Sequence, residues 1–293
     1  MSRCRNASPS ASVVGTRRMR IPRAALEPPR SRYPKSMRIA VLADIHGNLR
    51  ALEAVRADLR DRSPDVVVNL GDTVSGPLQA AATADLLMSQ PFVHIRGNHD
   101  RQLLNRPLAA MGPSDRAARE HLTSRHLEWL ARLPATHRLD DEILLCHGSP
   151  GDDLEYLLEE VDGDRVRLAA AEPIRTHLGT VNASLVLCGH THIPRSVRLP
   201  DGVCIVNPGS VGLPAYDDTR PWLHYVETGS PQARYAVVDR SPGTVRVEFI
   251  ALDYDWESAS REAAQANRPD WAHALATGYA LRASQASAAE ARP

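Results

Sequence analysis

The sequence predicts a mixed α/β fold, and two patterns along the chain support that class. Near the start, three short apolar runs alternate with amphipathic segments, in the order strand, helix, strand, helix, strand. This order is typical of parallel α/β units. Further along, Asp201-Gly202 and Pro242-Gly243 each separate two apolar runs, which is the pattern of an antiparallel hairpin. We therefore expect a pair of mixed sheets covered by helices, in one domain from about residue 37 to residue 281.

The first strands and helices can be assigned from their apolar spacing. Residues 39–43 form a continuous apolar run, which is typical of a buried strand. In the helix that follows, Leu52, Val55 and Leu59 share one face, and Asn48 is suited to cap its N-terminus. Further strands are expected at 65–70 and within FVHIRG, EILLCHG and ASLVLCG, and further helices within PLQAAATADLLMSQ, at about 114–132 and at about 165–178.

Three later segments are assigned from composition. The acidic segment 151–164 is expected to be a solvated helix face, with a loop beside a substrate site as the alternative. Residues 215–233 separate two strand regions and are expected to form a long loop, a kind of segment that is often functional in compact domains. The segment 256–281 is expected to be helical with a break near Pro269, and residues 282–293 are expected to be a disordered tail.

The first 36 residues differ in charge from the rest of the chain. They hold nine basic residues and one acid, and they are rich in Ser, Pro and Arg, a composition that cannot build a core. We expect residues 1–36 to be a disordered and functionally silent basic extension, without the apolar segment of a signal peptide. The remaining 26 basic and 34 acidic residues give a net charge of about −8, which argues against stable nucleic-acid binding.

The cysteines and the hydropathy indicate a cytoplasmic protein. The four cysteines, Cys4, Cys146, Cys188 and Cys204, form no CxxC pair, and the last three lie in apolar runs. Buried free thiols in a reducing compartment are therefore expected. No apolar run approaches 18 residues, so no membrane span is expected.

Five apolar runs end in residues of metal-ligand type. These are LADIHG with Asp44 and His46, NLGD with Asp72, RGNHD with Asn98, His99 and Asp100, LLCHG with His147, and LCGHTH with His190 and His192. Ligands of open α/β sheets bind at the carboxyl ends of the strands, so these side chains are expected to converge. A histidine of this kind in isolation is more often a hydrogen-bonded, half-buried side chain. Five such motifs in order, each after a strand, favour a functional site instead.

The mixture of ligand types indicates the chemistry. Oxygen and imidazole ligands without a thiolate cluster suit Mn, Fe, Zn, Co or Ni better than a structural zinc–cysteine site. The set is larger than one metal requires, and a carboxylate is the ligand best suited to bridge two. Two metals roughly 3.5–4 Å apart can hold one hydroxide and bind the oxygens of an in-line displacement, for which phosphate esters are the natural target.

The motifs D-x-H, G-D, G-N-H-D, H-G and G-H-T-H, in this order, resemble those of the calcineurin-like metallophosphoesterase superfamily. The strings ADIHGNLRALEAV, RGNHD, CHGSP, GHTHIP and VNPGSVGLP resemble its bacterial predicted-phosphodiesterase branch, and the resemblance covers nearly all of residues 37–281. It implies a four-layer α/β/β/α sandwich of two mixed sheets flanked by helices. It also implies a hydrolase of phosphodiester bonds that uses two divalent metal ions, manganese first, and a metal-bridging hydroxide.

The resemblance implies a role for each motif residue. The implied ligands are Asp44, His46 and His192 for the first metal, Asn98, His147 and His190 for the second, and Asp72 as the bridge. His99 would lie over the site, stabilise the phosphoryl oxygens and protonate the leaving group. Asp100 would orient His99.

One departure from the family pattern bears on the substrate. Protein Ser/Thr phosphatases and related diadenosine tetraphosphatases carry Asp-Arg-Gly three residues after the bridging Asp, where this chain has Ser75-Gly76-Pro77. The missing arginine argues against a protein phosphatase. Arg96 and Arg101 flank the GNHD motif and could replace it in substrate binding, with surface salt bridges as the alternative.

The ligand residues alone leave two other functions open. A phosphomonoesterase acting on nucleotides or phosphometabolites would use the same centre. A non-catalytic binding scaffold on this fold would tend to lose ligands or the overhanging histidine, and here His99 and all the ligands are present. The expected partner is a small phosphoester substrate, with homo-oligomers as an option. Tyr216, Arg220 or Trp222, in the expected long loop, would shape substrate choice.

Overall fold

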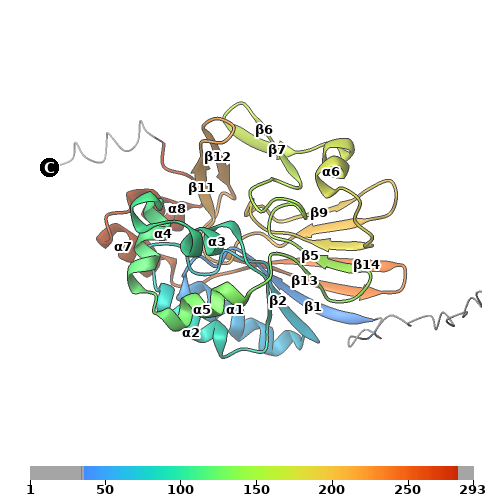
Figure 1. Cartoon of the computed structure of the whole chain (residues 1–293), viewed down its shortest axis with the longest axis horizontal. Helices are drawn as coiled ribbons and strands as arrows, with labels where there is room; N and C mark the ends of the chain where they lie inside the picture. The colour runs from blue at the N-terminus through green and yellow to red at the C-terminus, as the bar shows by residue number, and fades with distance from the viewer. Residues whose placement is uncertain (1–33, 35, 283–293) are drawn as a thin grey trace, which may run out of the picture. The chain divides into compact units, whose positions relative to one another are not determined.

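Two five-stranded sheets, which enclose a shared apolar core, are the central layers of the fold (Figure 1). The computed structural model describes residue 34 and residues 36–282. The expected basic extension and C-terminal tail therefore lie almost entirely outside the described residues. Within the described part, no helix has the length and apolar character needed to cross a membrane.

The first sheet has the order β14-β13-β1-β2-β3. Its strands are β1 (Met37–Leu42), β2 (Val66–Asn69), β3 (Val93–His94), β13 (Ala233–Ser241) and β14 (Thr244–Leu252). The first three are parallel to one another, as the α/β pattern predicts, and β13 pairs antiparallel with β1. The β13–β14 hairpin turns at Pro242-Gly243, where Gly243 supplies the positive φ of 73° that the turn requires.

The second sheet has the order β4-β5-β8-β10-β9. Its strands are β4 (His137–Arg138), β5 (Ile143–Leu145), β8 (Leu185–Leu187), β9 (Arg195–Arg198) and β10 (Cys204–Asn207). Strands β5, β8 and β10 are parallel, and β9 pairs antiparallel with β10 across the predicted turn at Asp201-Gly202. Both sheets are therefore mixed, as expected.

The core lies between the two sheets, and helices cover their outer faces. Ile39 and Val41 of β1 pack in one cluster with Leu145 and Leu187 of the second sheet. The alternate residue Leu42 belongs instead to the cluster under the helices. Strands buried on both faces read as continuous apolar runs, which is why these were recognisable in the sequence.

The helices complete a four-layer α/β/β/α sandwich, as predicted. On the first sheet lie α1 (Leu49–Arg62), α2 (Ala80–Met88) and α5 (Ser124–Arg132), and on the second sheet lies α6 (Ala171–Leu178) (Figure 1). Between α2 and α5 the chain forms α3 (Asn98–Asn105), the short 3-10 helix η1 (Leu108–Ala110) and α4 (Pro113–His121). The expected N-cap is confirmed, since the Asn48 side chain accepts a hydrogen bond from the N–H of Ala51 at 3.2 Å.

A third, four-stranded sheet was not expected from the sequence. It has the order β11-β12-β7-β6, with β6 (Glu159–Asp162), β7 (Arg165–Leu168), β11 (Ala215–Asp218) and β12 (His224–Glu227). The expected long loop at 215–233 and the helix expected from about residue 165 were therefore wrong in part. The Gly163-Asp164 turn favours a hairpin, because Gly163 adopts a φ of 62°. Cross-strand ion pairs from Arg167 to Glu160 and Asp162 stabilise it.

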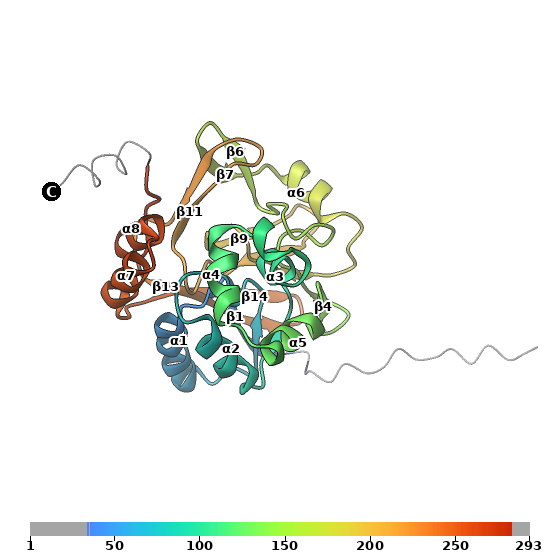
Figure 2. The ribbon, with the colours of Figure 1, turned by 60° about the vertical axis from the view of Figure 1, so that its left-hand side comes forward.

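The C-terminal segment forms two helices beside the third sheet. They are α7 (Trp256–Gln265) and α8 (Pro269–Thr277), and Pro269 begins α8, so the predicted break is confirmed. Helix α8 packs on β11 (Figure 2), and Trp271 shares a cluster with Ala215. This contact brings the end of the described chain close to the carboxyl ends of the parallel strands.

Candidate metal centre

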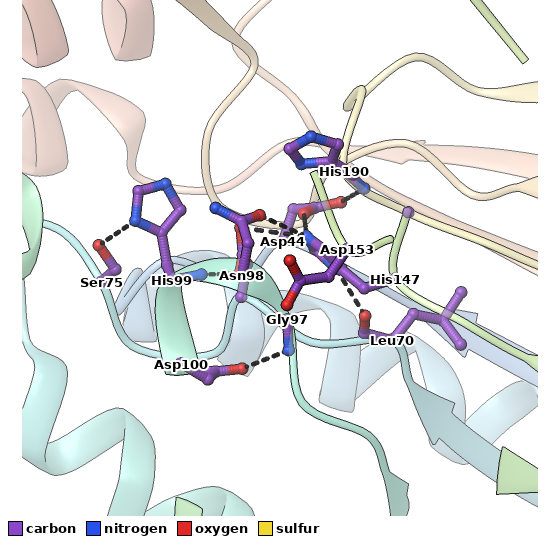
Figure 3. Close-up of polar contacts among 12 residues, drawn as sticks. Asp44, Leu70, Ser75, Gly97, Asn98, His99, Asp100, His147, Asp153 and His190 are labelled. Atoms are coloured by element: carbon purple, nitrogen blue, oxygen red, sulfur yellow. Dashed lines mark hydrogen bonds and ion pairs between the residues drawn. The ribbon is translucent and has the colours of Figure 1, made fainter. Parts of the chain in front are cut away.

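Strands from both five-stranded sheets end at one place, and all seven predicted metal ligands lie there. Asp44 and His46 follow β1, Asp72 follows β2, Asn98 begins α3 after β3, His147 follows β5, and His190 and His192 follow β8. Each of these residues is buried, with an exposed fraction of 8% or less. Figure 3 shows Asp44, Asn98, His147 and His190 gathered from different segments of the chain.

The ligand atoms form two groups. Asp44, His46 and His192 make one group and Asp72, His147 and His190 the other, and within each group the possible ligand atoms lie within 4.8 Å of one another. Asn98 joins the second group, because its side-chain amide lies 3.0 Å from Nε2 of His147. The structure therefore brings the residues together in the two sets that the family resemblance implies.

The histidine rings of the first group are oriented to accept a cation. His46 donates its Nδ1–H to the carbonyl of Ser75 at 2.8 Å, and His192 donates its Nδ1–H to the carbonyl of Leu213 at 2.7 Å. Each ring therefore turns Nε2, with its lone pair, into the site, and the two Nε2 atoms are 3.3 Å apart. Two lone pairs at this distance repel unless a cation or a proton lies between them. This arrangement fits a divalent metal bound by the two Nε2 atoms, with each ring held in place by its hydrogen bond to a backbone carbonyl.

The second group presents acceptors in the same way. His147 donates Nδ1–H to the carbonyl of Leu70 at 2.8 Å and turns Nε2 toward the side-chain amide of Asn98 and Asp72 Oδ2, the latter at 3.3 Å. His190 uses Nε2 for the carbonyl of Leu154 at 3.2 Å, so its Nδ1 is the nitrogen available to the site. The oxygen and nitrogen acceptors of this group also fit a divalent cation.

The two carboxylates are positioned differently. Asp72 Oδ2 lies 3.9 Å from His46 Nε2 and 3.3 Å from His147 Nε2, so this oxygen stands between the two groups. Asp44 accepts the N–H of His190 through Oδ2 at 3.1 Å, while its buried Oδ1 accepts no hydrogen bond from the described residues. The ring nitrogen Nε2 of His192 lies 3.5 Å from this oxygen. A buried carboxylate oxygen without a hydrogen bond is costly, and a metal would satisfy it.

The pKa values show which charge the centre lacks. Burial, followed by the neighbouring His192, lowers the pKa of His46 to about 4, and burial and His147 lower that of His190 to about 4. At His147, burial also acts to lower the pKa, but Asp72 and Asp44 outweigh it and raise the pKa to about 10. Without metals, a proton on His147 would balance the carboxylates, and bound cations would take over that role.

The backbone at the ligands is unusual. Positive φ angles occur at Asp44 (55°), His46 (52°), Asp72 (52°), His190 (71°) and His192 (57°). A left-handed conformation costs a residue other than glycine roughly 1–2 kcal/mol. Strain of this kind concentrates at functional sites, because the surrounding structure enforces it to direct a side chain.

The second-sphere residues differ from the sequence prediction. Asp100 does not contact the His99 ring: its carboxylate accepts the N–H groups of Thr73 and Gly97, both at 3.0 Å. Figure 3 shows Asp100 directed toward Gly97 and the His99 ring directed toward Ser75. The ring Nδ1 of His99 instead lies 2.7 Å from Oδ1 of Asp115, in α4. The expected orientation of His99 by Asp100 is corrected accordingly: Asp100 ties together the loops after β2 and β3.

His99 keeps a high affinity for its proton in this environment. Burial lowers its pKa, but the charge of Asp72 and the contact with Asp115 raise it to about 9. Sequence reasoning missed Asp115, because it lies 16 residues from His99 in a segment recognised simply as helical.

The two arginines proposed for substrate binding lie outside the cavity. Arg101 forms two hydrogen bonds of 2.6 Å with the carboxylate of Asp153, which is the salt-bridge alternative. Arg96 uses its backbone N–H for the carbonyl of Pro134 at 2.8 Å, and its side chain does not line the cavity.

A cavity of about 640 Å³ opens above the ligand groups. Helices α3 and α4 line it with His99, Gln102 and Ser114, and β11 and α8 line it with Tyr216 and Trp271. Of the three residues expected to shape substrate choice, Tyr216 and Arg220 line the cavity. Trp222 does not, and its exposed fraction is 52%.

The chain belongs to the calcineurin-like phosphoesterase superfamily, whose domain model matches residues 37–229. The chain is similar to a metallophosphoesterase from Sphaerobacter thermophilus, with 26% identity and a TM-score of 0.65, over 83% of this chain and 99% of that one. The family is one of metal-dependent hydrolases, in agreement with the two groups of ligand atoms.

Two further relatives are more distant. An uncharacterized protein from Methanocaldococcus jannaschii is 24% identical over 261 residues, which are 81% of this chain and 96% of that protein. A phosphoesterase from E. coli is 18% identical, with a TM-score of 0.40 over 74% of this chain and all of that one, and carries no inference about function.

Proposed function

We propose that the protein is a binuclear metal-dependent phosphodiesterase. The observation that carries the proposal is the convergence of seven buried ligands in two groups, with Asp72 Oδ2 between them. Two divalent ions, manganese first and Fe, Zn, Co or Ni as alternatives, would supply Lewis acidity and a hydroxide nucleophile near neutral pH. Asp44, His46 and His192 would hold one ion and Asn98, His147 and His190 the other, with Asp72 shared.

His99 is the residue best placed to act on the substrate. Its backbone N–H is bound to Asp72 Oδ1 at 2.9 Å, so the residue is tied to the shared ligand. Its ring lines the cavity with Nδ1 engaged by Asp115, which leaves Nε2 for the substrate. From there, Nε2–H would stabilise a phosphoryl oxygen or protonate the leaving group. Asp100 would act indirectly, by fixing the turn that begins α3.

The charges of the cavity favour a phosphodiester over a phosphomonoester. A monoester dianion gains from free cations close to the phosphate. Arg106, Arg220 and Arg268 line this cavity together with Asp217, Asp218 and Asp270, and Arg220 lies 3.8 Å from the carboxylate of Asp218. Arg268 is paired with Asp270 at 2.6 Å. A diester carries one negative charge and is therefore repelled less by these carboxylates than a dianion is.

The proposal includes a cytoplasmic location and a small substrate. Cys146, Cys188 and Cys204 are buried and unpaired, which supports a reducing compartment. A cavity of this size supports a small phosphoester better than a long nucleic acid.

A comparison of two chromogenic esters tests the function. After removal of metals with EDTA, the protein is assayed with bis-p-nitrophenyl phosphate and p-nitrophenyl phosphate, with each candidate metal added back. We expect metal-dependent turnover, faster with the diester. A preference for the monoester would support the phosphomonoesterase alternative, and no turnover of either ester with any metal would contradict both.

The shared ligand provides the matching variant. Asp72→Asn is expected to lower the bound metal, measured by elemental analysis, and to reduce kcat by roughly 10²-fold or more, since one ligand oxygen of both ions is lost. Asp239→Asn, at an exposed ion pair with Arg38, is the control and should change neither quantity. Retention of both metal and activity in Asp72→Asn would refute the shared position.

A further inference from the structure

A buried carboxylate approaches His99 from a separate helix. Asp115 lies in the first turn of α4, with an exposed fraction of 2%. Its Oδ1 is 2.7 Å from Nδ1 of His99, whose side chain is 32% exposed toward the cavity. The contact therefore joins the imidazole of His99, which substrate can reach, to the carboxylate of Asp115, which substrate cannot reach.

Asp115 makes few other polar contacts. The hydroxyl of Ser75 donates to the same Oδ1 at 2.7 Å, and the ring of His99 is also 3.3 Å from that hydroxyl. Among the described residues no lysine or arginine pairs with Asp115. A buried carboxylate held by one hydroxyl and one imidazole is costly to maintain unless both donors are retained. Packing alone would favour a neutral side chain at this position.

The sequence around Ser75 explains why a second segment is needed. Ser75 stands three residues after Asp72, and its backbone carbonyl is already used by the ring of His46. A neutral hydroxyl at this position cannot hold an imidazole N–H as strongly as a carboxylate does. Asp115 supplies that carboxylate from α4, and Ser75 holds it in place.

The position of α4 is itself fixed by contacts beside Asp115. The N–H of Gly76 donates to the carbonyl of Ser114 at 3.2 Å, and Arg268, the N-cap residue of α8, donates to the hydroxyl of Ser114 at 3.0 Å. Asp115 is therefore held from the loop after β2 and from the C-terminal helix. An acid in the first turn of a helix also interacts favourably with the helix dipole, which is the purely structural alternative.

We infer that Asp115, supported by Ser75, is the positioning residue of His99. It holds Nδ1–H of the ring and so keeps Nε2 directed into the cavity. The inference rests on the proposed phosphoesterase function, in which His99 acts on the substrate. Asp115 itself does not touch the substrate.

A double-mutant comparison separates positioning from structural support. Asp115→Ala is expected to lower kcat about 10- to 100-fold, within the range of a general acid, with KM and metal content close to wild type. The loss should be larger for esters with poor leaving groups, because these depend most on protonation. In a His99→Ala background, Asp115→Ala should cause no further loss. Equal additional loss in that background would overturn the inference, as would a loss independent of the leaving group.

Two further variants guard against a folding defect. Ser75→Ala should give a smaller loss of kcat, about 3- to 10-fold, that also disappears in the His99→Ala background. Glu120→Ala, exposed on the same helix, is the control for α4 and should match wild type.

An NMR measurement that does not depend on activity separates the inference about Asp115 from the proposed phosphoesterase function. In the zinc-loaded protein labelled with ¹⁵N at histidine, the Nδ1 proton of His99 should be protected and shifted downfield, and Asp115→Ala should abolish that signal. An unprotonated Nδ1 in the wild type would overturn the inference. Inactive wild-type protein that shows the signal would contradict the phosphoesterase function and leave the contact established.

Discussion

The direction of each ligand side chain depends on its own backbone turn and on one hydrogen bond. The left-handed conformation at His190 and at His192 directs two imidazoles from one short segment into different groups. A carbonyl bonded to the opposite ring nitrogen then decides which nitrogen faces the site. Short motifs carry these side chains, so the residues that converge at the candidate site could be predicted from the sequence. The contact of Asp115 with His99 and that of Arg101 with Asp153 could not, because each depends on the packing of two distant segments.

Gly97 is a sensitive position beside the shared ligand. A Cβ added there would lie 2.2 Å from Asp72 Oδ1 and 2.4 Å from the Asp72 nitrogen. We expect Gly97→Ala to displace Asp72, lower the bound metal and reduce the free energy of unfolding by about 1–3 kcal/mol, as overpacking does. Elemental analysis and urea unfolding measure the two effects. Gly151→Ala is the control, because its Cβ would meet no atom within 4 Å. Unchanged metal content in Gly97→Ala would show that Asp72 can move without loss of the centre.

Some strands and turns could be predicted from their own sequence, and others could not. Strands β1, β2, β5 and β8 are buried on both faces and could be predicted from apolar runs, as could the turns that contain Asp201-Gly202 and Pro242-Gly243. The third sheet could not. Its strands β6 and β7 are mostly charged, and β7 is mostly exposed. Strand β12 pairs in parallel with β7, about 60 residues earlier, through the single register pair Tyr225 and Arg165. Pairing of this kind is set by tertiary contacts more than by local preference.

The main contribution of helix α8 to the cavity lining is the side chain of Trp271. This side chain is 5% exposed, packs against Gly76 and meets the His46 ring edge-on, with 5.9 Å between ring centroids. We expect Trp271→Ala to cost about 3–5 kcal/mol of stability in urea unfolding and to raise KM, because it removes part of the cavity wall. Trp222→Ala is the matched control, since Trp222 is 52% exposed, and should cost less than about 0.5 kcal/mol. Equal effects of the two substitutions would contradict the role given to α8.

At the scale of the whole molecule, the ligands connect the two central sheets. Asp44, Asp72 and Asn98 come from the first sheet, whereas His147 and His190 come from the second. A cation bound between these residues would therefore link the two central sheets directly. The layered architecture could be predicted from the order of strands and helices and from the family resemblance. The structure was needed to show that residues after 230 complete the first sheet, through β13 and β14, and line part of the cavity, through Arg268 and Trp271.

Removal of metals is therefore expected to destabilise the entire fold. Ligand linkage gives about 2.7 kcal/mol when the metal concentration is 100 times its dissociation constant. For a domain of this size, that corresponds to a decrease of roughly 5–10 °C in the unfolding midpoint. Calorimetry with and without EDTA measures the shift, and Asp72→Asn should show a smaller one. An identical midpoint with and without metal would mean that the centre does not couple the sheets.

The helix that reaches Ser114 lies outside the portion of the chain that defines the family. The family model ends at residue 229, whereas Arg268 and Trp271 come after it. The candidate metal ligands therefore lie within residues 44–192, whereas part of the cavity lining comes from residues near the end of the described chain. We therefore expect substitutions in α8 to change the opening of the cavity while the candidate ligand motifs stay intact.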